Sequence, residues 1–190
     1  MRTAVVAILG GLACAAVGQS GDGLKEVAPP PLPFYDWGAC PFEGCGYGKD
    51  WTAHKAVTLY DTWKAERRAI GQLAEGDRVT GFSGVVVTTK PGVIRVDRDL
   101  PGQNLKRGDT ILTYANRGEG YSAVWFKGRY YASFDISFAK RMDGTGCGGD
   151  HCAGAYVEAG NHVWWAQVKL GSGQLGWVEM DLGEVPVAVY

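Results

Sequence analysis

Four of the five cysteines in this chain fall into two pairs of equal spacing, and they are its clearest candidates for chemistry. The pairs read CPFEGC, from Cys40 to Cys45, and CGGDHC, from Cys147 to Cys152. Such pairs can bind zinc through thiolates, take part in redox catalysis or form disulfides. The compartment that the chain enters decides between these outcomes, because disulfides persist in oxidising environments and are rare in the cytosol.

The N-terminus has the pattern of a secretory signal peptide, which we expect to span residues 1–18. One positive charge at Arg2 is followed by a short apolar run, 4–12, and then by small residues before Gln19. That run is well below the length of about 20 residues that a membrane-spanning helix needs. No other apolar run approaches membrane length, so no membrane span is predicted.

A lipid anchor on Cys14 is the alternative at the N-terminus. The residue three positions before this cysteine is Gly11, where a lipoprotein signal has Leu, and this difference favours plain cleavage. We therefore expect an exported protein, located in the periplasm or cell envelope or secreted.

An even number of cysteines in an exported chain favours disulfides. We expect two local bridges, Cys40–Cys45 and Cys147–Cys152, each closing a six-residue loop worth about 2 kcal/mol on a chain-entropy model. Bridges between the two sites would close longer loops and gain more on that model, so the sequence leaves the connectivity open. Zinc held by the four thiolates, with His151 as a substitute ligand, is allowed by the spacing but not indicated by it. Neither pair has the C-x-x-C spacing of a redox catalyst.

Composition argues against several classes of function. The 19 basic and 20 acidic residues give a formal net charge of −1 with no basic run, so no nucleic-acid partner is predicted. The sequence contains no HExxH, no GxSxG and no complete phosphate-binding loop. Neither His54 nor His162 has a visible aspartate partner. We therefore predict no enzymatic activity, no metal and no cofactor.

The elements around these residues are expected to be short strands and tight turns, because 29 glycines and 22 aromatic residues favour such elements over helices. Residues 19–50 read as a Pro-rich linker that carries the first cysteine pair, with polyproline II structure before Pro33. Residues 64–73 are expected to form a long loop, and Lys127-Gly128 a hairpin turn. The expected strands are 57–60, 78–82, 85–88, 93–96, 110–114, 121–126, 129–134, 163–170, 175–180 and 185–190.

Two neighbouring tryptophans are expected to face opposite ways, because side chains alternate along a strand. Trp164 shares its face with Ala166 and Val168 and is predicted to lie in the core. Trp165 shares the other face with Gln167, and this polar neighbour predicts partial exposure.

Four stretches, in order along the chain, resemble the motifs of an SH3 domain. TLYD at 58–61 resembles the ALYD box, and LAEGDRV at 73–79 resembles the diverging turn. VWWA at 163–166 is similar to the strand with paired tryptophans, and GQLGWV at 173–178 to the closing strand. In an exported chain this combination resembles the bacterial SH3 (SH3b) variety.

The resemblance implies an all-β fold of SH3-like small barrels over residues 51–190. The segment of about 83–162 is far longer than an ordinary SH3 domain holds at this place. It is therefore either a long β insertion in one barrel or a second, tandem SH3-like unit.

The resemblance also implies a groove for ligands, with Tyr60, Trp63, Trp164 and Trp165 as candidate binding residues. The implied function is a non-catalytic binding or scaffolding module of the cell envelope, with peptidoglycan or its peptide stems as partner. The alternative is an adaptor for extended protein peptides, whose groove is occupied by the chain's own P-x-x-P segment at 28–33. A cell-wall hydrolase is the third hypothesis, for which every catalytic constellation lacks a member.

Overall fold

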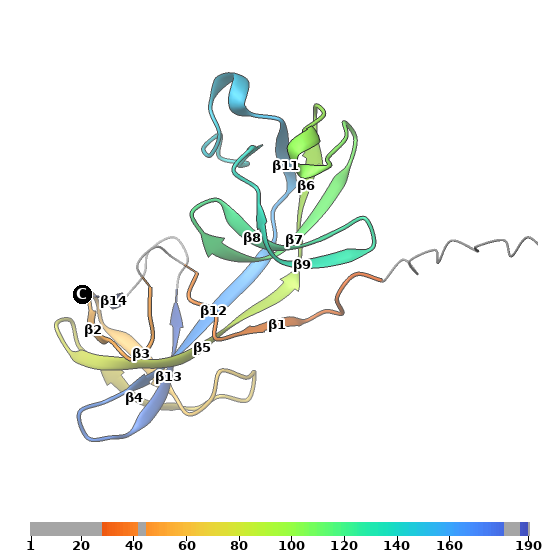
Figure 1. Ribbon diagram of the computed structural model, residues 1–190. Helices are drawn as coiled ribbons and strands as arrows, with labels where there is room; N and C mark the ends of the chain where they lie inside the picture. The colour runs from red at the N-terminus through yellow and green to blue at the C-terminus, as the bar shows by residue number, and fades with distance from the viewer. Residues whose placement is uncertain (1–27, 42–44, 181–186, 190) are drawn as a thin grey trace, which may run out of the picture.

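The computed structural model describes residues 28–41, 45–180 and 187–189 (Figure 1). The described chain is all-β, with curled sheets of small-barrel type, as expected from the sequence. The expected signal peptide, 1–18, and the alternative lipidation site, Cys14, lie outside the described residues. Within the described residues, no helix has the length and apolar character needed to cross a bilayer.

The first sheet is assembled from both ends of the described chain. Its strands are β1 (Phe34–Trp37), β2 (Asp50–Ala53), β3 (Val57–Tyr60), β4 (Ala69–Leu73), β5 (Arg78–Lys90), β12 (Asn161–Lys169), β13 (Leu175–Met180) and β14 (Val187–Val189). They follow the order β14-β2-β5-β12-β13-β3-β4, and β1 is an additional partner of β5. The long strand β5 therefore pairs with β2 near its start and with β1 near its end.

The second sheet comes from the chain between β5 and β12. Its strands are β6 (Gly92–Val96), β7 (Thr110–Gly118), β8 (Tyr121–Phe126), β9 (Arg129–Asp135), β10 (Ala139–Lys140) and β11 (Gly154–Glu158). They follow the order β10-β11-β6-β7-β8-β9, and only the short β10–β11 pair is parallel. In Figure 1, β5 and β12 lie side by side and lead from the first sheet to the second.

Most strands lie where the sequence pattern predicts them. The β8–β9 hairpin turns at Lys127 and Gly128, whose φ angles of 47° and 72° suit a two-residue turn. Residues 69–73 form β4, so the prediction of a loop there is wrong. Only one residue of β4 is buried, so this strand carries no apolar alternation that a sequence pattern could reveal. The strands expected at 78–82 and 85–88 form one continuous strand, β5.

Two hydrophobic clusters form the core. The first surrounds Trp51 and Trp164, both 0% exposed, and the second surrounds Ile94 in the second sheet. Tyr114 and Ala123 belong to the second sheet but pack into the first cluster. The two sheets are therefore joined by shared apolar packing.

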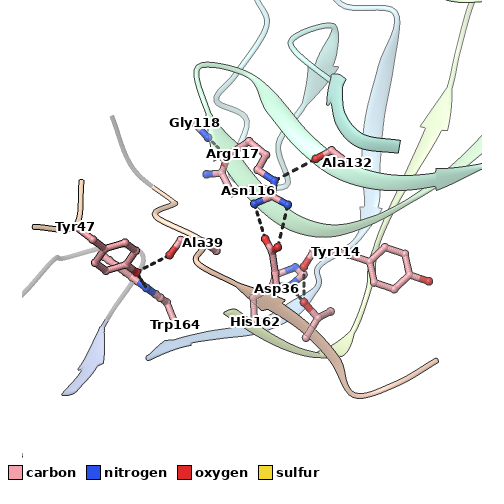
Figure 2. A network of polar contacts seen from close by, with 11 residues as sticks. Asp36, Ala39, Tyr47, Tyr114, Asn116, Arg117, Gly118, Ala132, His162 and Trp164 are labelled. Atoms are coloured by element: carbon pink, nitrogen blue, oxygen red, sulfur yellow. Dashed lines mark hydrogen bonds and ion pairs between the residues drawn. The ribbon is translucent and has the colours of Figure 1, made fainter. Parts of the chain in front are cut away.

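Strand β1 also joins the two sheets, because its side chains alternate between them. The Phe34 ring lies 5.1 Å from the ring of Tyr114 and 5.8 Å from that of Tyr130, both in the second sheet. Asp36 reaches the same sheet through an ion pair with Arg117 (Figure 2). The sequence assigns these β1 residues to the Pro-rich linker, whereas the structure packs them between the sheets.

Both cysteine pairs are local, as expected. Cys40 and Cys45 are bonded with their Cα atoms 5.5 Å apart, and Cys147 and Cys152 with theirs 5.2 Å apart. In the part of the chain that the structure describes, no group of three or more His, Cys, Asp or Glu residues is placed to hold a metal ion.

Candidate functional site

One side of the first sheet gathers aromatic side chains from separate strands. Directly paired residues of antiparallel strands share a face. Trp165 on β12 is paired with Val85 on β5, and Val85 is also paired with Trp37 on β1. Trp177 on β13 is paired with Tyr60 on β3, and strand alternation puts Trp177 on the same side as Trp165.

Trp63, in the loop after β3, contacts the aromatic rings of Tyr35, Trp37 and Trp177. The centre of its ring lies 5.4 Å from that of Tyr35, 5.6 Å from that of Trp37 and 6.5 Å from that of Trp177. All three contacts are edge-to-face, the arrangement that aromatic quadrupoles favour. We call this surface the aromatic face, formed by Tyr35, Trp37, Tyr60, Trp63, Trp165 and Trp177.

Arg67 lies over the centre of the aromatic face. Its guanidinium carbon is 4.8 Å from the ring centre of Trp165 and 5.3 Å from that of Tyr60, within the range of cation–π interactions. Its Nη2 is also 3.9 Å from a carboxylate oxygen of Glu179. The Tyr60 and Trp165 rings themselves meet edge-to-face at 5.8 Å. These neighbours leave Trp165 only 4% exposed, so the prediction of partial exposure is wrong.

The structure brings together three of the four candidate groove residues predicted from the sequence. Tyr60, Trp63 and Trp165 belong to the aromatic face, with Tyr60 and Trp63 partly exposed. Trp164 points to the opposite side of β12, is 0% exposed and packs edge-to-face on Trp51 at 6.2 Å. The side chain of Trp164 is therefore in the core and outside the groove, as strand alternation requires of the residue before Trp165.

A half-buried tyrosine, Tyr47, is hydrogen-bonded to the side chain of Trp164. The Tyr47 hydroxyl donates to the carbonyl oxygen of Ala39 at 2.6 Å and accepts from Trp164 Nε1 at 3.3 Å (Figure 2). Burial raises the pKa of Tyr47 to about 12, so its hydroxyl stays neutral at physiological pH. The hydroxyl lies so close to Gly84 that a Cβ atom there would overlap it. This packing holds β5 and β12 in place, and with them the aromatic face.

Tyr35, Trp37 and Trp177 are the members of the aromatic face that the sequence analysis missed, and the most exposed of them are Tyr35 and Trp37. Their side chains are 42% and 60% exposed, and both rings contact Trp63. The signal that could have found them is the alternation in FYDW, where Phe34 and Asp36 face inward.

The proline-rich segment 28–33 leads directly into β1. Five of its six residues are exposed, including Leu32 at 48%. Two of the rings that contact Trp63, those of Tyr35 and Trp37, belong to β1 and not to the segment 28–33 itself.

No family model, curated protein or solved structure matches this chain. The aromatic face presents chemical groups that can contact a ligand. Its rings offer flat apolar surface, while Arg67 and Glu179 add one charge of each sign. Such a surface suits ligands that present rings or extended chains, including proline rings and sugar rings.

Proposed function

We propose that this protein is a non-catalytic binding module that holds an extended ligand across the aromatic face. The observation that carries the proposal is the clustering of rings from β1, β3, β12, β13 and the loop after β3, with Trp37 60% exposed. Contiguous apolar surface left in water marks interaction sites in soluble proteins. Tyr and Trp provide large contact areas at low cost in conformational entropy.

The two disulfides support a place in an oxidising compartment, which agrees with export to the periplasm or cell envelope or with secretion. In that compartment the leading ligand is peptidoglycan or its peptide stems, in line with the SH3b resemblance. The second candidate is an extended protein peptide. The P-x-x-P segment beside β1 favours this candidate, because proline-rich segments of this kind bind aromatic-lined grooves in other proteins.

The test is a sedimentation assay with purified peptidoglycan, run beside a panel of proline-rich peptides. The variants are Trp37→Ala and Tyr35→Ala, which remove exposed rings from the aromatic face. The matched control is Val157→Ala, a side chain 47% exposed on β11 in the second sheet. Circular dichroism of each variant shows whether the fold is kept.

Loss of peptidoglycan binding in Trp37→Ala, with binding kept in Val157→Ala, supports the leading ligand. Binding of peptides alone, with the same dependence on Trp37, supports the second candidate. Equal binding by wild type and Trp37→Ala contradicts a role for the aromatic face. Turnover of peptidoglycan by the purified protein contradicts a non-catalytic function.

A further inference from the structure

A cavity of about 470 Å³ lies at the junction of the two sheets, apart from the aromatic face. Val86 of β5 and His162 of β12 line it from the first sheet, and Thr113 and Ser122 line it from the second. A smaller cavity of about 320 Å³ adjoins it and shares Arg141 as a wall residue. Small-molecule sites in proteins commonly measure about 300–1,000 Å³, so the larger cavity has the size of a ligand site.

His162 lines this cavity with its imidazole ring, whose Nε2 atom lies next to the wall residue Gly160. Its Nδ1 atom is 3.0 Å from Thr88 Oγ1, and that hydroxyl donates its own hydrogen to the carbonyl oxygen of Tyr114 (Figure 2). Because the Thr88 hydrogen is used, Nδ1 must carry the hydrogen of the second bond, which leaves Nε2 as a bare acceptor. Burial lowers the pKa of His162, which keeps the ring neutral near pH 7.

Three hydroxyl groups meet in another part of the wall. The Tyr156 side chain is hydrogen-bonded to those of Thr113 and Ser122, each of which is 3% exposed. Burial raises the pKa of Tyr156, while the Thr113 bond and the nearby charge of Arg141 oppose that rise. Arg141 is therefore close to this buried polar group.

Arg141 supplies the positive charge of the cavity wall. It forms no ion pair with any other residue that the structure describes. Asp143 also lines the cavity, but one of its carboxylate oxygens accepts from the backbone and the hydroxyl of Thr145 at 2.8 and 2.6 Å. These bonds lower the pKa of Asp143, so its charge persists beside Arg141.

We propose that this cavity binds a small carboxylic acid that also carries a hydrogen-bond donor, as an N-acylated amino acid does. The carboxylate pairs with Arg141, which is suited to planar oxyanions. The donor of the ligand bonds to Nε2 of His162. The apolar body lies against Val86, Ile136 and Met142. This site is separate from the aromatic face and does not depend on the function proposed for it.

The test is a titration of the ¹⁵N-labelled chain with N-acetylated amino acids bearing small, branched or aromatic side chains. Each acid is paired with its C-terminal amide, which is neutral and has an NH2 group in place of one carboxylate oxygen. Binding is expected to shift the backbone resonances of Thr113, Ser122 and Gly160 and the Nε2 resonance of His162. The amides are expected to bind at least about tenfold more weakly, because they lose the charge-assisted bond.

Variants assign the effect to the cavity. Arg141→Gln removes the charge but keeps a polar side chain, and is expected to weaken acid binding about tenfold or more. The matched control is Arg95→Gln, an exposed arginine on β6 that does not line the cavity. Trp37→Ala is expected to leave acid binding unchanged, which separates this site from the aromatic face.

The proposal is overturned if no acid of the panel shifts the cavity resonances at millimolar concentration. It is also overturned if acids and amides bind equally, or if Arg95→Gln weakens binding as much as Arg141→Gln. Shifts confined to residues of the aromatic face would likewise assign the ligand to that surface and not to the cavity.

Discussion

Asp36 and Arg117 form a bidentate ion pair that holds β1 against the second sheet. Arg117 Nη1 is 2.7 Å from one carboxylate oxygen of Asp36, and Nη2 donates to the other at 2.9 Å. The Arg117 Nε atom donates to the carbonyl oxygen of Ala132 at 3.1 Å, which anchors the guanidinium (Figure 2). Burial raises the pKa of Asp36, and the charge of Arg117 opposes that rise. Tyr35 and Trp37 alternate with Asp36 along β1, so the ion pair also positions rings of the aromatic face.

Replacing Arg117 by Leu is expected to lower the free energy of unfolding by about 3 kcal/mol. That is the lower end of the range for leaving a buried charge unpaired, because the Arg117 side chain is 28% exposed. Urea denaturation measures the loss. The control is Glu158→Gln, which breaks a Lys90–Glu158 pair whose side chains are 56% and 53% exposed and is expected to cost below about 1 kcal/mol. A loss of stability in Arg117→Leu no larger than in the control would contradict the proposal that this ion pair holds β1 against the second sheet.

His162 predicts that stability falls on mild acidification. Its pKa in the folded state lies below the ordinary value of 6.5, so the unfolded chain binds the proton more readily. The stability that neutral His162 contributes is therefore fully present above about pH 6.5. It is lost as the pH falls toward the pKa of His162 in the folded state. Urea unfolding across this pH range should show the decline in wild type and a flatter profile in His162→Gln. The exposed His151→Gln variant should keep the wild-type profile, and a His162→Gln profile identical to wild type would count against the prediction.

Gly84→Ala is expected to destabilise the protein by about 1–3 kcal/mol, the usual cost of overpacking a core. The added methyl group would overlap the Tyr47 hydroxyl and approach Trp164 Nε1 to 2.9 Å. In a Tyr47→Phe background the same substitution is expected to cost less, because the overlapped oxygen is gone. Thermal or urea unfolding of the wild type, the two single variants and the double variant gives the coupling energy between positions 84 and 47 directly.

Gly71→Ala is the matched control, since its nearest atom would be Leu59 Cδ1 at 3.9 Å. It is expected to change the stability little. If Gly84→Ala costs the same with and without the Tyr47 hydroxyl, the close approach is not the cause of the loss.

The disulfides predict that the folded protein, made in an oxidising compartment, contains no reactive thiol among Cys40, Cys45, Cys147 and Cys152. Thiol titration after denaturation without reductant measures this. Replacing both Cys147 and Cys152 by Ser is expected to lower the free energy of unfolding by about 2 kcal/mol, the chain-entropy value for so short a loop. Four titratable thiols in the unreduced material would disprove the pairing.

Local chemistry was enough to predict several elements of this fold. The Lys127-Gly128 turn and strand β13 follow from turn residues and alternation, which involve only neighbouring positions. The cysteine loops were predicted from their equal spacing and the expectation of export. Strand alternation also predicted that Trp164 is buried.

The parts that the sequence analysis missed depend on contacts between distant segments. Trp165 has a polar neighbour in Gln167, yet Arg67 and Tyr60 cover its ring. Strand β1 exists because β5 is long enough to pair with a second partner beyond β2. No pattern within the residues around Trp165 or β1 encodes these partners.

The placement of the second sheet between β5 and β12 has a consequence for synthesis on the ribosome. Strand β5 emerges before residues 91–160, whereas β12, its main partner, follows them. At about 5–20 residues per second, β5 remains for several seconds without β12 along its edge. During that time the second sheet can complete its own pairings, which brings Lys90 and Asn161 together and shortens the loop that β12 must close. Trp51 meanwhile has no Trp164 to pack against, so the nascent chain exposes apolar surface and an open strand edge until β12 is made.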